Sequence, residues 1–184
     1  MIVLGIDPGS RKTGYAVLDT GRKIGSALEY GTIKLTDLKS MPEKLVRIFE
    51  RVTGLLAKYR IESVAVEAGF YGKNAQSAYK LGYARSAAVL AAALGRIEVV
   101  EYSPRKVKQA VTGNGEASKT QVKFMVKKLL GLKNDAQIKE DEADACAVAI
   151  CHSHTRRSLK RGYRNWKEFV EANKDRVIRT SGQR

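Results

Sequence analysis

Two carboxylates each close a short apolar segment of the sequence. Asp7 follows a run of mostly apolar residues and precedes a Pro-Gly pair, and Glu67 ends a second apolar run at residues 61–67. Such runs, bounded by turn-forming residues, are typical of buried strands. A charge inside a buried strand is costly unless a cation compensates it. An Asp that simply begins a turn is the more common explanation for Asp7 alone.

A second pair of acids, Asp141 and Asp144, lies near the start of the last predicted helix, at residues 138–152. Residues three apart share one face of a helix, and the helix dipole favours acids near the N-terminus. Taken alone, this pair would be ordinary helix-start acids. Glu142 is turned about 100° from Asp141, and we expect it to be a solvated acid of the first turn.

The clustering of the four acids requires one common explanation, because the chain as a whole has a net charge of +15. A strand that follows a crossover helix runs parallel to the first strand, so Asp7 and Glu67 should share the sheet edge where α/β folds build sites. Hard divalent cations relieve repulsion among clustered carboxylates. Two Mg²⁺ ions about 4 Å apart can activate water and stabilise the leaving oxygen of a phosphodiester. The pattern therefore predicts a two-metal nuclease site with Mg²⁺, or Mn²⁺ in its place, held by Asp7, Glu67, Asp141 and Asp144.

The elements around these acids predict an α/β fold with a mixed five-stranded sheet flanked by helices. Strands are predicted at residues 1–6, 13–19, 23–35, 61–67 and 97–102, the first three forming an antiparallel meander. Apolar residues at helical spacing predict helices at residues 41–56, 74–94, 104–111, 118–130 and 138–152. Ser118 is a candidate N-cap. Residues 1–154 should form one domain and residues 155–184 a basic extension, with a short amphipathic helix at 165–173.

The charge distribution points to nucleic acid as the partner. Residues 73–133 carry a net charge of +9, residues 153–184 carry +7, and the remainder carries −1. Two basic blocks around a charge-balanced core fit a polyanion-binding surface better than a generic basic surface does.

The sequence shows neither a membrane-spanning segment nor a zinc-finger motif. No apolar run approaches the roughly 20 residues of a membrane span, and Met1 leads directly into a strand without a signal peptide. Cys146 and Cys151 are expected to be reduced thiols, because His152 and His154 supply no familiar zinc spacing. A cytoplasmic protein is therefore expected.

Several motifs resemble the RuvC family of crossover junction endodeoxyribonucleases. They are GIDPGS at 5–10, TGY at 13–15, VE at 66–67, FYGKN at 70–74, KLGYAR at 80–85, VKQ at 107–109 and DEADA at 141–145. The resemblance runs in order through residues 1–154. It implies a ribonuclease-H-like fold, a homodimer, Mg²⁺-dependent paired nicking of four-way (Holliday) junctions in recombination and repair, and a branch-migration helicase complex as partner.

The resemblance also assigns roles to individual residues. Asp7, Glu67, Asp141 and Asp144 would be the metal-binding catalytic acids. Phe70 would stack on an unpaired base near the crossover, and Lys108 and Lys119 would lie beside the scissile phosphate. The remaining DNA-binding candidates are Tyr71, Lys73, Asn74 and Arg85. Alternatively, Phe70 is a core aromatic and the two lysines are solvated. The helix at 74–94 suits a dimer surface or a plain core helix.

Residues 155–184 depart from the family pattern, which ends soon after the last predicted helix. The stretch 156–164 holds five positive charges and no acid, and we hypothesise that it contacts DNA phosphates. Trp166 and Phe169 would dock the extension back onto the domain.

Three other functions share parts of this pattern. Actin-like ATPases and sugar kinases begin with a similar strand and Asp, but they need two such domains and far more chain. A related fold with roles in transcription or RNA processing does not explain the Phe70 segment. A junction-binding protein without catalysis would have no use for four clustered acids.

Overall fold

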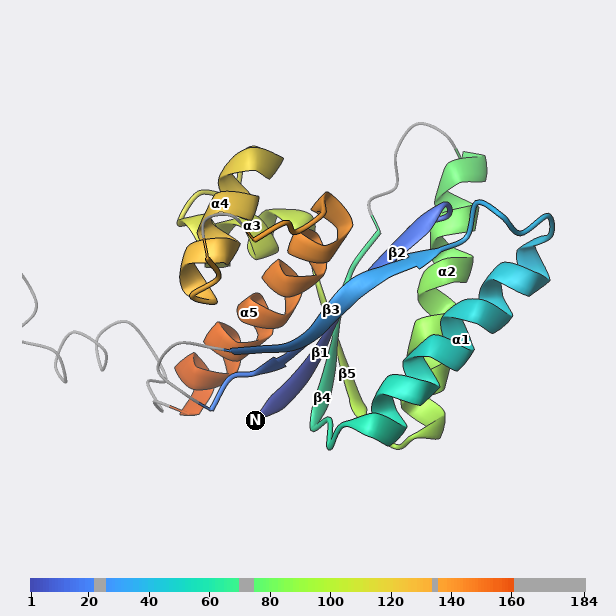
Figure 1. The fold of residues 1–184 in the computed structure, drawn as a ribbon, viewed down its shortest axis with the longest axis horizontal. Coiled ribbons are helices and arrows are strands. Elements are labelled where there is room, and N and C mark those ends of the chain that lie inside the picture. The colour runs from blue at the N-terminus through green and yellow to red at the C-terminus, as the bar shows by residue number, and fades with distance from the viewer. Residues whose placement is uncertain (22–25, 70–74, 134–135, 161–184) are drawn as a thin grey trace, which may run out of the picture. The chain divides into compact units, whose positions relative to one another are not determined.

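A computed structural model describes residues 1–21, 26–69, 75–133 and 136–160 (Figure 1). Its five-stranded sheet has the order β3-β2-β1-β4-β5. The strands are β1 (Ile2–Asp7), β2 (Lys12–Asp19), β3 (Ser26–Lys34), β4 (Ser63–Glu67) and β5 (Glu98–Tyr102). The first three form an antiparallel meander, and β4 and β5 run parallel to β1. The predicted mixed sheet and the predicted crossover are therefore confirmed.

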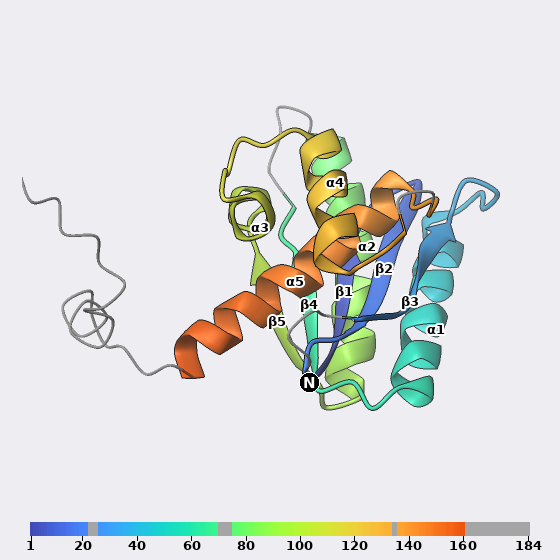
Figure 2. The same ribbon diagram turned by 60° about the vertical axis from the view of Figure 1, so that its left-hand side comes forward.

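Helices cover both faces of this sheet (Figures 1 and 2). They are α1 (Met41–Lys58), α2 (Ala75–Leu94), α3 (Pro104–Thr112), α4 (Lys119–Leu129) and α5 (Glu140–Lys160). One core lies between the sheet and α1 and α2. The other lies between the sheet and α5, with α3 and α4 packed outside. None of the described helices is both long and apolar enough to cross a membrane.

The helix that carries Asp141 and Asp144 differs from its prediction at both ends. It begins at Glu140 and continues to Lys160, eight residues past the expected end. Residues 153–160 include good helix formers and neither Gly nor Pro, so nothing in the sequence stops the helix at residue 152. By its internal contacts the chain divides into Met1–His154 and Thr155–Arg184. The predicted helix at 165–173, with Trp166 and Phe169, lies outside the described residues.

The first part of α5 lies directly on the backbone of the sheet. A Cβ atom at Gly14 of β2 would lie 1.9 Å from the carbonyl oxygen of Asp141. A Cβ atom at Gly5 of β1 would lie 2.2 Å from the carbonyl oxygen of Ala145. Real Cβ atoms do not come so close to an oxygen, so glycine at these two positions sets how near α5 can approach. The distance between α5 and the strands is therefore fixed at the part of the helix that carries Asp141 and Asp144.

Candidate active site

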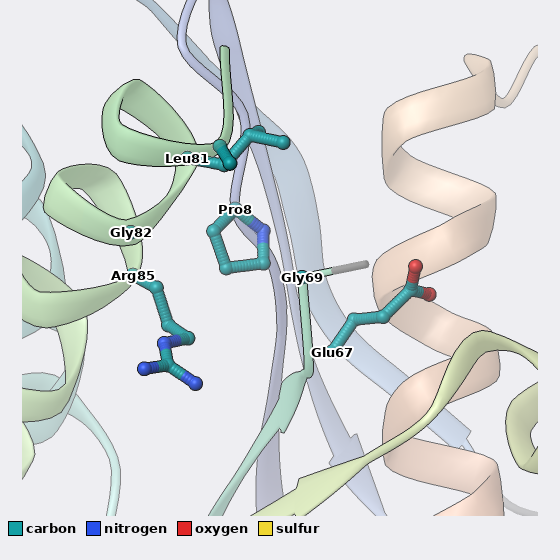
Figure 3. A pocket seen from close by; sticks show the side chains of 7 residues that line it. Pro8, Glu67, Gly69, Leu81, Gly82 and Arg85 are labelled. Carbon is teal, nitrogen blue, oxygen red and sulfur yellow. The ribbon is translucent and has the colours of Figure 1, made fainter. Parts of the chain in front are cut away.

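The strands β1 and β4 end side by side, each with a carboxylate. They pair in parallel through Ile6 and Val66, and Asp7 and Glu67 are the next residues of the two strands. Ile6 and Val66 pack into the core beneath α1 and α2. Because side chains alternate along a strand, both carboxylates belong to the α5 face. Figure 3 shows the Glu67 carboxylate pointing toward α5 and away from α2.

Asp7 shows most clearly that the four acids converge. Burial, and then the neighbouring carboxylate of Glu67, raise the pKa of Asp7 to about 8, with further contributions from Asp144 and Asp141. Burial, and then Asp144, raise the pKa of Glu67 to about 7. Burial also raises the pKa of Asp144. The predicted strand-end and helix-start acids therefore lie within electrostatic reach of one another.

Two of the predicted lysines lie at the same place. The Nζ atom of Lys119 is 3.4 Å from a carboxylate oxygen of Asp144 and 3.9 Å from one of Glu140. Lys119 is the first residue of α4. Ser118 is the N-cap of this helix, as predicted, and it also forms a capping box with Gln121. Lys119 and Lys108 both act against the rise in the pKa of Glu67. Both lysines thus face the acids.

The structure describes one further predicted site residue, Arg85. Arg85, on α2, forms an ion pair with Glu101 at 2.7 Å. Phe70, Tyr71, Lys73 and Asn74 fall outside the described residues.

The donor set of the site consists of carboxylate oxygens, which suit hard divalent cations such as Mg²⁺ or Mn²⁺. The electrostatics of the site also suit a cation. Burial and repulsion favour the protonated, neutral forms of Asp7 and Glu67, and a bound cation would offset both effects. As the side chains lie, no three His, Cys, Asp or Glu residues of the described ranges are grouped so that they could hold a metal ion. The backbone brings the four predicted metal-binding acids to one place, whereas their side chains do not form a coordination shell in this structure.

Metal affinity should depend steeply on pH. A carboxylate must lose its proton to bind a cation, and the pKa values of Asp7 and Glu67 are about 8 and 7. We expect the apparent affinity for Mn²⁺ to rise at least tenfold per pH unit between pH 6 and 7 and to level off above about pH 9. Calorimetry in two buffers of different ionisation enthalpy should show about one or more protons released per ion at pH 7. An affinity independent of pH would contradict this assignment of protons.

Glu142 is not the solvated acid that the sequence predicted. Its side chain is only 8% exposed. One carboxylate oxygen accepts the backbone N–H of Lys139 at 2.9 Å, and the other accepts the hydroxyl of Thr32 at 3.3 Å. The physical reason is that β3 reaches across to the start of α5, which the helical spacing of the acids does not reveal. Glu142 therefore ties the helix that carries Asp141 and Asp144 to the sheet.

Removing the hydrogen bonds of Glu142 should weaken metal binding, although Glu142 is not itself one of the predicted metal ligands. We expect Glu142→Ala to lower Mn²⁺ affinity about tenfold, in the range typical of groups that support metal ligands. Glu142→Gln keeps an acceptor oxygen and should stay within about threefold of the wild type. Mn²⁺ binding followed by electron paramagnetic resonance measures both variants without relying on cleavage. Equal affinities for the Ala and Gln variants would show that Glu142 does not position the acids.

A buried pair of side chains next to Glu67 was not predicted from the sequence. The hydroxyl of Tyr102 lies 2.9 Å from Nδ1 of His152, and both side chains are buried. Tyr102 pairs with Glu67 across β5 and β4, and its carbonyl accepts the N–H of Ala68. His152 thus links α5 to the sheet beside Glu67. The sequence offers no signal for this pair, because its members lie 50 residues apart and form no motif.

Comparison with known proteins identifies the family. The family model "Crossover junction endodeoxyribonuclease RuvC" matches residues 3–152. The chain belongs to the RuvC family. Its RuvC relative from Citrifermentans bemidjiense is 50% identical over 155 residues, covering 84% of this chain and 93% of the relative. Thermus thermophilus RuvC, solved in complex with a Holliday junction substrate, superposes with a TM-score of 0.79 at 36% identity, covering 86% of this chain and 96% of that one. The predicted family and its ribonuclease-H-like fold are confirmed.

The residues beyond 154 are less unusual in this family than the sequence suggested. The RuvC relative from Salinibacter ruber is 41% identical over 179 residues, covering 96% of this chain and 99% of the relative. That coverage reaches well into the basic extension. The extension therefore has a counterpart in at least one other RuvC protein.

Proposed function

We propose that this protein resolves four-way DNA junctions by paired, symmetric hydrolysis of phosphodiester bonds, in homologous recombination and DNA repair. The observation that carries the proposal is the convergence of Asp7, Glu67, Asp141 and Asp144 with two lysines at one sheet edge. The family is one of endodeoxyribonucleases, and a relative of this fold was solved with a Holliday junction. The chain is an enzyme of this hydrolase family.

In this proposal Asp7, Glu67, Asp141 and Asp144 hold two Mg²⁺ ions, with Mn²⁺ as a substitute. When bound, the ions would activate a water molecule and neutralise charge on the phosphate. The carboxylates must first rotate toward one another, and Lys119 must release Asp144. An ammonium freed in this way stands beside the phosphate, where Lys119 and Lys108 stabilise the charge that develops in the transition state.

Two symmetric nicks require two sites, and α2 offers a surface that would bring two copies together. Its exposed large side chains are Tyr79, Tyr83, Leu90 and Leu94. Their spacing places them on one side of the helix. An apolar patch of this kind on a basic, charged protein marks an interface, so a homodimer through α2 is part of the proposal.

DNA contacts complete the proposal. Phe70, Tyr71, Lys73, Asn74 and Arg85 would bind the junction near the crossover. Residues 1–154 would form the nuclease domain, and residues 155–184 would add phosphate contacts. A branch-migration helicase complex would deliver the junction in the cytoplasm.

The test is an end-labelled synthetic four-way junction incubated with the protein in Mg²⁺ or in EDTA. The expected products are nicked duplexes from cuts at symmetric positions in two opposing strands, seen only with Mg²⁺. A linear duplex of the same sequence should remain uncut. Tight junction binding without any cleavage across many sequences and metals would instead favour a binding protein without catalysis.

A further inference from the structure

The helix that carries Lys108, α3, is short and depends on its neighbours for its position. It spans nine residues, fewer than the roughly 12–15 that an isolated helix needs to be even marginally stable in water. Val107 and Val111 are buried and join α3 to the core that also contains α5 (Figure 2). Because apolar burial is non-directional, these two side chains anchor α3 without fixing how it is turned or shifted along that core.

One turn of α5, at residues 151–154, makes polar contacts that do have a direction. The hydroxyl of Tyr102, the last residue of β5, lies 2.9 Å from Nδ1 of His152, and both side chains are buried. The thiol of Cys151, a weak donor, lies 3.8 Å from the carbonyl oxygen of Lys106 in α3. The turn therefore meets both the end of β5 and the helix that follows it.

A third contact holds the C-terminal part of α3. Nδ1 of His154 lies 3.1 Å from the carbonyl oxygen of Ala110. Because a carbonyl oxygen only accepts, this nitrogen is the donor. Ala110 is among the last four residues of α3, whose carbonyls lack a partner inside the helix. The 151–154 turn thus contacts positions 102, 106 and 110, which are the end of β5 and two successive turns of α3.

Lys108 lies between these contacts and faces the acids. Its charge counters the rise in the pKa of Glu67, and Tyr102 pairs in register with Glu67 across β5 and β4. A hydrogen bond prefers a narrow range of distances and angles. Contacts on either side of position 108 therefore fix where its side chain begins relative to the strand ends.

We propose that the 151–154 turn of α5 positions Lys108 for the reaction by holding α3 through these hydrogen bonds. Tyr102, His152 and His154 are then positioning residues, which act on the substrate only through another side chain. The inference rests on the proposed function for the role of Lys108 beside the phosphate. A misplacement of about 1 Å caused far from the reacting atoms can lower a rate about a hundredfold, so contacts of this kind matter without touching the DNA. One helix would thus carry two acids near its start and set the position of a lysine that complements them.

Two substitutions remove these hydrogen bonds with little disturbance of the core. Tyr102→Phe removes only a hydroxyl, and His154→Ala removes a side chain at an exposed position. His154→Asn keeps an N–H donor close to the position of Nδ1 and should restore that contact. The matched control is Tyr59→Phe, which removes a hydroxyl that donates to Glu29 at 2.9 Å on the α1 side of the sheet.

The first measurement is amide hydrogen exchange of the free protein, without DNA or metal. Loss of the directional contacts should let α3 open more often. In the double variant Tyr102→Phe/His154→Ala, we expect the amides of residues 104–112 to exchange about tenfold faster, while those of α1 stay within about twofold of wild type. Tyr59→Phe should leave exchange at residues 104–112 unchanged. Wild-type exchange at these residues in the double variant would overturn the inference.

The second measurement is single-turnover cleavage of a labelled four-way junction in Mg²⁺, with protein in excess. The double variant should cleave about tenfold more slowly while its junction affinity stays within about threefold, and Asn in place of Ala at position 154 should recover much of the rate. In a Lys108→Ala background the same substitutions should have no further effect on the rate, because the group that they position is gone. Tyr59→Phe should cleave at the wild-type rate.

The outcomes separate this inference from the proposed function. Equal losses of rate with and without Lys108, a loss confined to junction affinity, or a His154→Asn variant as slow as His154→Ala would each overturn the inference while leaving the proposed function intact. A wild-type protein that cuts no junction would overturn the proposed function and the inference with it. The two failures are distinguishable because only the second one is seen in the wild type.

Discussion

Asp7→Asn is expected to reduce junction cleavage by a hundredfold to a thousandfold or more while junction binding stays within about threefold. Asn has nearly the size of Asp but cannot carry the charge that a divalent cation requires. In addition, all three of the other acids contribute to the raised pKa of Asp7. Single-turnover cleavage and gel-shift affinity, measured on the same junction, check the two halves of this prediction. Cleavage that survives the substitution would remove Asp7 from the site.

The same substitution should stabilise the metal-free protein at high pH. Burial and neighbouring acids raise the pKa of Asp7 to about 8 from its ordinary value of 3.8. The folded state therefore binds a proton that the unfolded state has lost, so wild-type stability falls as the pH rises from about 4 to 8. Asn escapes this loss and should gain about 1–3 kcal/mol above pH 8, with no gain below pH 4. Glu116→Gln, at an exposed acid, is the matched control and should change neither stability nor cleavage.

Gly14→Ala should harm both stability and function. The added Cβ would lie 1.9 Å from the carbonyl oxygen of Asp141, in the backbone of α5. Backbone cannot swing aside as a side chain does, so either β2 or the start of α5 must shift. Overpacking of this kind costs about 1–3 kcal/mol. Because Asp141 lies at the point of contact and Asp144 one turn further, we also expect Mn²⁺ affinity to fall at least tenfold.

The control for this prediction is Gly54→Ala, which adds the same methyl group where no atom lies within 4 Å. That variant should be slightly more stable than wild type because alanine favours a helix. Thermal unfolding and Mn²⁺ titration distinguish the two variants. A Gly14→Ala protein with wild-type Tm and metal affinity would show that α5 does not rest on β2 as closely as described.

The sequence alone predicted the sheet and the convergence of its acids for identifiable reasons. Asp7 and Glu67 end apolar runs that a helix connects, and the handedness and direction of such crossovers are nearly fixed. Asp141 and Asp144 share a helix face by their spacing. Local periodicity and a general rule of topology were enough for these four positions. Lys108 and Lys119, by contrast, could be told apart from the other lysines only through the resemblance to the family.

What the sequence did not show depends on contacts between distant segments. Glu142 was predicted to be solvated because its own helix places it away from Asp141, yet Thr32 of β3 meets it there. The glycines at 5 and 14 matter only because α5 docks directly on them. His152 was considered only as a zinc ligand, while the fold pairs it with Tyr102. Each of these follows from packing that no local pattern encodes.

The most direct test of the central claim is where a divalent cation binds. Crystals of the protein grown with Mn²⁺ and measured near the manganese absorption edge locate each ion by its anomalous signal. The account predicts ions between Asp7, Glu67, Asp141 and Asp144, with Lys119 withdrawn from Asp144. Full Mn²⁺ occupancy at some other set of residues, with these four acids left unligated, would contradict it.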